Sequence, residues 1–336
     1  MLLSVVIPAY NEALSLPELI TVLRRTLDPL ELDYELLFID DGSRDGSREV
    51  LRRFASADQR IKVLAFSRNF GHQAAITSGL DFAEGDAVVV MDADLQDPPD
   101  LLPSMLDLFH EGYDVVSAQR VRREGDTLFK RMTARGFYWF MQTMVDKRIV
   151  PEVGDFRLFS REAVLLLRNF REQHRFMRGL VAWLGLKEAI VPLERLSRHA
   201  GKTNYSLLRM VKLAWTAVCS FSALPLRLSL AVGFVLSAGA FGYFVFAAYA
   251  ALVTKRVVPG WTSLVFLLCL FFGFIFIALG MIGDYLARIY EESKGRPLYV
   301  IGGFDNIAAD TLARPRAAVL AQRRPEKPGA KVTREP

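Results

Sequence analysis

Two aspartates separated by one residue are the most chemically informative feature of the sequence. Asp92 and Asp94 follow the apolar run 87–91, so in extended chain their carboxylates point to the same side. Two such carboxylates suit a hard divalent cation, Mg²⁺ or Mn²⁺, and Gln96 can add an oxygen. A cation held there would neutralise a diphosphate and stabilise it as a leaving group. The simpler alternative is an exposed acidic pair after a strand.

This acidic pair belongs to one of four polar clusters that each follow a short apolar run. The runs cover residues 2–7, 34–39, 61–66 and 87–91. Ligands of open α/β sheets bind beyond the carboxyl ends of the strands, so the four clusters predict a site there. The clusters contain Pro8, Tyr10, Asn11 and Glu12; Asp40, Asp41, Gly42 and Ser43; Arg68 and Asn69; and Asp92, Ala93 and Asp94.

The segments between the runs predict crossover helices. Residues 14–27, 45–57, 72–83 and 98–110 carry apolar side chains at helical spacing. The runs themselves are apolar without alternation, which is typical of parallel strands covered on both faces. A fifth strand is expected at 113–117. The sequence therefore predicts an α/β domain with a Rossmann-like, mainly parallel sheet.

Two charge-free stretches late in the chain predict transmembrane helices. Arg227 to Lys255 and Arg256 to Asp284 each enclose roughly 27 uncharged residues, more than the ~20 that cross a bilayer as a helix. Both are rich in Phe, Leu and Ala, which is typical of membrane spans. A pair of buried core helices in a soluble domain is the alternative.

The flanking charges predict the orientation of these spans. The chain begins with a strand and meets Pro8 too early for a signal sequence. Basic residues lie on the side of the N-terminal domain and again after the second span, at Arg209, Lys212, Arg227, Arg288, Lys294 and Arg296. The positive-inside rule then predicts a multi-pass protein of the inner (cytoplasmic) membrane, with the catalytic domain and both termini cytoplasmic.

The expected domain organisation follows from these elements. We assign 1–205 to the α/β domain, 206–226 to a juxtamembrane amphipathic helix, and 227–290 to two transmembrane helices. Residues 291–308 are expected to form a short cytoplasmic segment and 309–336 a basic, disordered tail.

Composition excludes several other classes. Cys219 and Cys269 lie in or beside the apolar stretches and predict neither a disulfide framework nor a zinc site. The four histidines show no ligand spacing. The net charge of +5 is modest, and the folded part has no basic face with interleaved aromatics, so we expect no nucleic-acid partner.

The motifs together resemble a known family. Val5-Val6-Ile7-Pro8-Ala9-Tyr10-Asn11-Glu12, Asp40-Asp41-Gly42-Ser43 and Asp92-Ala93-Asp94 resemble the family 2 glycosyltransferases with the GT-A fold. The resemblance continues through Arg68-Asn69-Phe70-Gly71-His72, Leu95-Gln96-Asp97-Pro98-Pro99, Gly154-Asp155-Phe156-Arg157 and Gly201-Lys202-Thr203-Asn204-Tyr205. With the two spans it looks like the polyprenyl-phosphate branch, which includes dolichol-phosphate mannose synthases and bacterial undecaprenyl-phosphate sugar transferases.

The resemblance implies roles for the donor side. Pro8, Tyr10 and Glu12 would border the nucleoside, with Tyr10 facing the base and Glu12 accepting from ribose hydroxyls. Asp41 would read the base edge, with Asp40 as the alternative. The metal ligands would be Asp94 and Gln96, with Asp92 as a possible third that otherwise contacts ribose or sugar. Ala93 would be a further nucleotide-sugar contact. Arg120 ends the fifth strand and is thereby placed to meet phosphate or sugar, with a surface arginine as the alternative.

The resemblance also implies an acceptor side. Asp155 would face the anomeric carbon as a base or as an orienter of the acceptor, and a structural ion pair with Arg157 is the alternative. A lipid phosphate is already anionic, so its oxygen can attack without losing a proton to the enzyme. Basic side chains would then neutralise it, and the candidates are Arg131, Arg135, Arg157, Arg198 and Lys202. Asn204 stands where the family commonly has lysine.

Basic and apolar residues mix at 129–145 and 207–224, which predicts interfacial helices at the membrane surface. Small residues in the spans favour close helix contact and a homo-oligomer. The resulting prediction is an inverting transfer of a hexose from a UDP- or GDP-sugar, with UDP-glucose the first choice, to a polyprenyl phosphate, undecaprenyl phosphate first. A separate flippase and a downstream glycosyltransferase would use the product. The alternatives are a processive polysaccharide synthase and a noncatalytic membrane scaffold.

Overall fold

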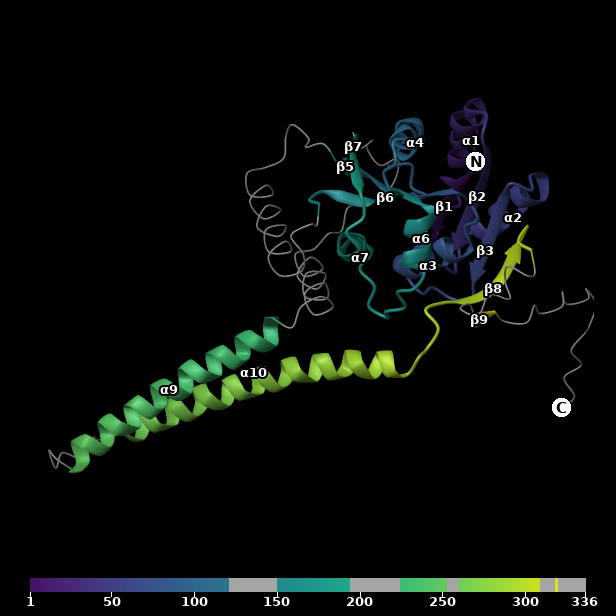
Figure 1. Cartoon of the computed structure of the whole chain (residues 1–336). Coiled ribbons are helices and arrows are strands. Elements are labelled where there is room, and N and C mark those ends of the chain that lie inside the picture. Colours follow the sequence, from purple (N-terminus) through teal and green to yellow (C-terminus); the bar gives the residue numbers. More distant parts are fainter. Residues whose placement is uncertain (121–149, 194–223, 253–259, 309–317, 320–336) are drawn as a thin grey trace, which may run out of the picture.

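One sheet organises the N-terminal part of the chain. The computed structural model describes residues 1–120, 150–193, 224–252, 260–308 and 318–319. Within them the strands lie in the order β7-β5-β6-β4-β1-β2-β3-β8-β9 (Figure 1). The strands are β1 Leu2–Ala9, β2 Asp33–Asp40, β3 Ile61–Phe66, β4 Ala87–Val90, β5 Val115–Arg120, β6 Val153–Ser160, β7 Glu188–Leu193, β8 Val300–Asp305 and β9 Ala318–Val319.

The centre of this sheet is parallel. β1 pairs in parallel with both β2 and β4, and β2 pairs in parallel with β3. β6 runs antiparallel between β4 and β5, while β7 is parallel to β5. The predicted α/β class with a mainly parallel sheet is therefore confirmed. The insertion of an antiparallel strand beside β4 was not predicted.

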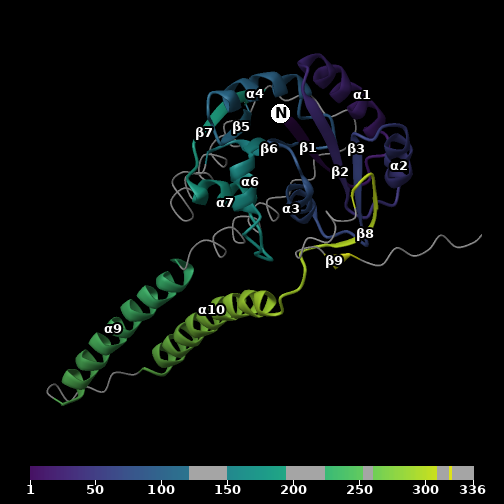
Figure 2. The same ribbon diagram turned by 45° about the vertical axis from the view of Figure 1, so that its right-hand side comes forward.

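Helices cover both faces of the sheet (Figures 1 and 2). α1, α2 and α4 share one apolar core with one face, and α3, α6 and α7 share a second core with the other. The helices are α1 Leu16–Leu27, α2 Ser47–Ala57, α3 His72–Phe82, α4 Leu102–His110, α6 Arg161–Leu167 and α7 Met177–Leu184, with short 3-10 turns η1 Asp28–Leu30 and η2 Pro99–Leu101.

Side-chain periodicity explains these two cores. In β1, Val5 and Ile7 face the core with α1, whereas Val6 between them faces the core with α3. α1 places five apolar residues on its sheet side at helical spacing, and Pro17 suits its first turn because no intrahelical N–H is needed there. Each large apolar side chain buried in this way contributes about 1.5–3 kcal/mol.

A strand beyond the last long helix returns to the sheet. β8 pairs antiparallel with β3. Tyr299, just before it, is 1% exposed, stacks on Phe66 at 5.2 Å and donates a 2.7 Å hydrogen bond to Asp81 of α3. Residues 300–305 of the stretch expected to form a short cytoplasmic segment, 291–308, thus belong to the sheet of the α/β domain. The reason is that apolar residues of this stretch fill the core beside α3.

The structure describes two residues of the C-terminal tail, 309–336. Of the stretch predicted to be disordered, Ala318–Val319 form β9, which pairs in parallel with β8. An apolar dipeptide can use the backbone groups that β8 leaves open at the edge of the sheet.

Two long apolar helices lie outside the α/β domain. α9 Leu224–Leu252 and α10 Trp261–Ser293 run side by side as a hairpin (Figures 1 and 2). The stretches Pro225–Ala247 and Phe266–Ser293 have mean hydropathies of 2.0 and 2.6, and none of their most apolar residues is buried. Both helices are long and apolar enough to cross a membrane, which agrees with the two predicted spans. The predicted helix at 206–226 lies mostly outside the described residues.

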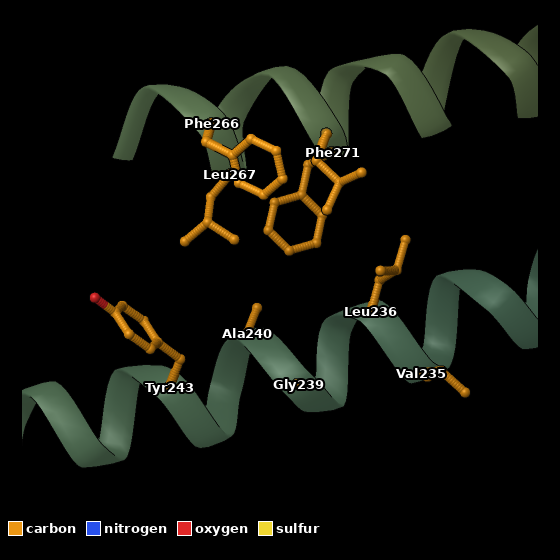
Figure 3. A pocket seen from close by; sticks show the side chains of 9 residues that line it. Val235, Leu236, Gly239, Ala240, Tyr243, Phe266, Leu267 and Phe271 are labelled. Carbon is orange, nitrogen blue, oxygen red and sulfur yellow. The ribbon is translucent and has the colours of Figure 1, made fainter. Parts of the chain in front are cut away.

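An open apolar cavity of about 650 Å³ lies between the two helices of the hairpin. It is lined from α9 by Leu236, Ala240 and Tyr243, and from α10 by residues that include Phe266 and Phe271 (Figure 3). Gly239 leaves space on the α9 side, since a Cβ built there meets no atom within 4 Å. This cavity lies within the hairpin, away from the strand ends.

The C-terminal end of α10 contacts the α/β domain directly. His174 Nε2 lies 2.6 Å from Glu291 Oε2, and the Gln173 N–H donates to Glu292 at 2.7 Å. The Gln173 side chain donates to the Arg296 carbonyl at 2.6 Å. The segment between α6 and α7 therefore holds the end of the hairpin.

Candidate active site

The loops after β1 and β2 are tied together at the carboxyl edge of the sheet. Asn11 has a positive φ of 58°, its N–H donates to Ser43 at 2.9 Å, and its side-chain oxygen accepts from the Arg44 N–H at 2.9 Å. Beside them the Tyr10 ring is 46% exposed, while Pro8 is buried. An exposed aromatic ring on a fixed loop is available for stacking on a planar ligand.

The two aspartates at the end of β2 are buried and hold backbone. Asp40 accepts from the Ser43 N–H at 3.0 Å, and Asp41 accepts from the N–H groups of Phe70 at 2.7 Å and Gly71 at 3.0 Å. Burial raises the pKa of Asp41 although these two donors oppose the shift. Both carboxylates thus stabilise the backbone of the loops at this edge. The predicted role of Asp41, or alternatively Asp40, in reading the base stays a prediction.

Only glycine fits between these two loops. Gly42 has φ +71°, and a Cβ there would lie 2.6 Å from the Arg68 carbonyl carbon. The turn after β2 can therefore press against the loop after β3. This contact brings the second and third polar clusters together, as the sequence predicts.

The Asp-Ala-Asp segment forms a compact turn after β4. The Asp92 N–H donates to Asp97 at 3.1 Å, and the Gln96 N–H donates to Asp94 at 3.2 Å. Leu95 between them has φ 60°, and Ala93 is buried. The carboxylates of Asp92 and Asp94 stay partly exposed on this turn.

Gln96 lies beneath this turn with its side chain 2% exposed. Among the residues that the structure describes, its Nε2 has no hydrogen-bond partner. A buried amide donor left open in this way favours an anionic or carbonyl ligand at the turn.

The acidic residues at this edge fit a divalent cation. Burial raises the pKa of Glu12, Ser15 opposes the shift with a hydrogen bond, and the charges of Asp94, Asp45 and Asp92 raise it further. Negative charge is therefore in excess here. Within the described ranges no three His, Cys, Asp or Glu side chains form a ready cage. Magnesium sites often use one or two carboxylates and leave the other positions to water and substrate phosphates, so this donor set fits such an ion.

The antiparallel direction of β6 brings its beginning to the same edge. Val90 pairs with Arg157, so the register continues toward Asp92 beside Asp155. His72, the first residue of α3, lies between these two aspartates. Its Nε2 is 3.2 Å from Asp155 Oδ2 and 3.6 Å from Asp92 Oδ1. The His72 imidazole therefore connects Asp92 of the predicted donor side with Asp155 of the predicted acceptor side.

Asp155 is held by two cations. Its other oxygen lies 3.4 Å from Nε of Arg178, in the first turn of α7. Burial would raise the pKa of Asp155, but the hydrogen bond from His72 and the charges of Arg178, His72 and Arg157 hold it far below its usual range. Burial would likewise lower the pKa of His72, yet Asp155 and Asp92 raise it overall. The site thus favours an ionised Asp155.

Arg157 is buried beneath the site. Its side chain is 4% exposed, its Nε donates to the Gly154 carbonyl at 3.3 Å, and it lies 4.0 Å from Glu188 of β7. Glu188 also accepts from Ser117 at 2.5 Å. Burial lowers the pKa of Arg157 although the Glu188 and Asp155 charges oppose the shift. The buried position of Arg157 favours a role in stabilising the ionised Asp155 by its charge.

Several predicted residues cannot be located at the site. Arg120 ends β5 opposite Leu193 of β7. The acceptor-phosphate candidates Arg131, Arg135, Arg198 and Lys202 lie outside the described residues, as does Asn204.

Two residues of the site were missed by sequence reasoning. His72 stands within the motif Arg68-Asn69-Phe70-Gly71-His72, but no role was assigned to it. Arg178 lies in no motif, because its contact with Asp155 depends on how α7 packs against β6. The position of His72 at the start of a helix, close to the carboxyl end of a strand, was a signal that could have been used. The sequence around Arg178 contains no such signal.

Comparisons with known proteins identify the family of this chain. The model of the family described as glycosyl transferase family 2 matches residues 4–166. The uncharacterized glycosyltransferase YkcC of Bacillus subtilis (strain 168) is 44% identical over 298 residues, which cover 89% of this chain and 92% of that protein. The prophage bactoprenol glucosyl transferase homolog of Escherichia coli (strain K12) is 35% identical over 301 residues, covering 90% and 98%.

Among solved structures, glucosyl-3-phosphoglycerate synthase from Mycobacterium tuberculosis aligns with a TM-score of 0.46 and 21% identity, over 65% of this chain and 77% of that one. The near full-length relatives define the class: the chain belongs to glycosyl transferase family 2. It is a glycosyltransferase with the GT-A fold, as the motifs predict.

Proposed function

We propose that this protein transfers a hexose from a nucleotide sugar to a polyprenyl phosphate, with inversion at the anomeric carbon. UDP-glucose and undecaprenyl phosphate are the first choices. The observation that carries the proposal is the union, in one chain, of the Asp92–His72–Asp155 edge with two exposed apolar helices. The relatives named bactoprenol glucosyl transferase, which align over almost their whole length, support a lipid acceptor and glucose.

The donor half would be the edge formed by β1, β2 and β4. Tyr10 offers a ring for the base, and Glu12 offers a carboxylate to ribose hydroxyls. Mg²⁺ or Mn²⁺ held by Asp94, with Gln96 or Asp92, would neutralise the leaving diphosphate. The role of the protein is to concentrate carboxylates on one turn and to fix that turn through Asp97.

The acceptor half would be the beginning of β6. A lipid phosphate carries its own negative charge near neutral pH, so no proton has to be removed before it attacks. The ionised Asp155 is therefore better suited to positioning than to proton abstraction. Direct attack opposite the diphosphate is a single displacement at the anomeric carbon, so it gives inversion. Most of the rate enhancement would come from orienting two anions in line.

The membrane arrangement completes the proposal. α9 and α10 would cross the inner (cytoplasmic) membrane, with the catalytic domain and both termini in the cytoplasm. Small residues along the hairpin support association of copies into a homo-oligomer. Two helices do not make a path for a sugar, so a separate flippase and a downstream glycosyltransferase would act on the product.

The test is sugar transfer by the full-length protein in detergent. Labelled UDP- and GDP-hexoses are offered with undecaprenyl phosphate, with and without Mn²⁺ or Mg²⁺. The proposal expects metal-dependent label in the lipid extract, lost in Asp94→Ala and kept in Asp107→Ala, an exposed carboxylate on α4. Label in a long water-soluble polymer would instead indicate a processive synthase. Nucleotide binding without any transfer would indicate a noncatalytic scaffold.

A further inference from the structure

Arg178 is the one arginine beside Asp155 that reaches solvent, among the residues that the structure describes. Its side chain is 34% exposed, against 4% for Arg157. Nε points to Asp155 at 3.4 Å, and the two terminal nitrogens make no hydrogen bond to any described residue. A guanidinium held at one nitrogen and open at the others can bind an anion through two parallel N–H groups.

The surroundings place this open guanidinium on the acceptor side. Arg178, Asp155, His72 and Asp92 form a continuous chain of contacts at 3.4, 3.2 and 3.6 Å. Asp92 belongs to the acidic turn that would meet the donor. Arg178 lies at the other end of this series of contacts, and the buried Asp155 carboxylate separates it from that turn.

We infer that Arg178 binds the phosphate of the acceptor lipid and that Asp155 and His72 are the residues that position it. This inference rests on the proposed function and names the phosphate contact within it. Asp155 has one oxygen on each cation, so it fixes the direction of Arg178 while His72 fixes Asp155 from the donor side. The phosphate is then held next to the carbon it attacks.

The segment that carries Arg178 supports this placement. The Met177 N–H donates to the Gln73 side chain at 3.2 Å, which ties the first turn of α7 to α3. Upstream, Gln173 and His174 contact the C-terminal end of α10. Arg178 therefore stands four residues from a direct contact with the apolar hairpin, where a lipid headgroup would arrive.

The experiment measures steady-state transfer by the full-length wild type, Arg178→Gln and Arg178→Lys, with undecaprenyl phosphate and the nucleotide sugar varied in turn. Arg25→Gln is the matched control, because Arg25 is exposed on α1 and makes no contact at the site. For Arg178→Gln we expect the KM for the lipid phosphate to rise about 10- to 150-fold, the range for losing a hydrogen bond to a charged group. The KM for the nucleotide sugar stays within about twofold, and Arg178→Lys recovers part of the loss because it keeps the charge.

Two results would overturn the inference. One is an unchanged KM for the lipid phosphate in Arg178→Gln, whatever happens to kcat. The other is an equal rise of both KM values, which indicates a general distortion of the site. Absence of transfer in the wild type would instead refute the proposed function, so the two failures are distinguishable.

Discussion

Replacing Tyr299 by phenylalanine isolates one contact that holds β8 to the rest of the domain. The hydroxyl donates to Asp81 at 2.7 Å in a buried setting, and Arg171 contacts the same carboxylate at 2.6 Å. A hydrogen bond to a charged group contributes about 1.5–3 kcal/mol. Tyr299→Phe keeps the ring on Phe66, so the loss is confined to the contacts of the hydroxyl. The local opening of β8 should therefore become about 10- to 150-fold more frequent.

The assay is amide hydrogen exchange of residues 300–305 in the full-length protein, because β8 pairs there with β3 and β9. Tyr290→Phe is the control, since that side chain is 63% exposed on α10. Tyr299→Ala should act more strongly, because truncating a buried aromatic costs about 3–5 kcal/mol. Equal exchange of β8 in Tyr299→Phe and Tyr290→Phe would refute the view that this contact holds the strand.

Three further outcomes are expected. His72→Ala should lower kcat about 10-fold or more and leave the KM for the nucleotide sugar unchanged. His72→Gln keeps an N–H donor and should recover part of the lost kcat. A change in the KM for the nucleotide sugar alone would contradict the positioning role. Gly79→Ala should destabilise the domain by about 1–3 kcal/mol in thermal unfolding, because its Cβ would lie 2.0 Å from Val6 Cγ1, and Val6→Ala should relieve the loss. The pKa of Asp155 is lower in the folded protein than its ordinary value of 3.8, so its ionised form stabilises the fold at pH values above 3.8. This stabilisation is lost as the pH falls below 3.8 toward the folded-state pKa. Asp155→Asn should therefore flatten the acid limb of stability against pH, and an unchanged limb would contradict the ion pairs.

The parallel half of the fold could be predicted because each element there is encoded locally. Apolar runs such as 34–39 lie between helical patterns, and the helix that follows each strand fixes the parallel direction. The polar clusters at the strand ends could be predicted to meet for the same reason. The motifs then allowed the family to be recognised.

The remaining elements depend on contacts between distant parts of the chain. β8 is short, contains Gly302 and Gly303, and follows a long apolar helix, so nothing local marks it as a strand. Its place is set by Tyr299 and Asp81, which are 218 residues apart in sequence. Arg178 reaches Asp155 only through the packing of α7. These contacts depend on the tertiary structure, so neither partner carries a local sequence signal for them.

In the proposed membrane arrangement, the strand order also decides which edge of the sheet is attached to the two long helices. The chain leaves the sheet at the end of β7 and returns at the start of β8, seven strand spacings away, or about 34 Å. β7 is parallel to the central strands and β8 is antiparallel to them, so departure and return both lie on the edge that carries the acidic turn. Two attachments on one edge restrict rotation and tilting of the domain, whereas a single attachment would not. In the proposed membrane arrangement, the bilayer and the site would therefore share one side of the sheet, and a headgroup could reach the site while its hydrocarbon chain stays in the membrane.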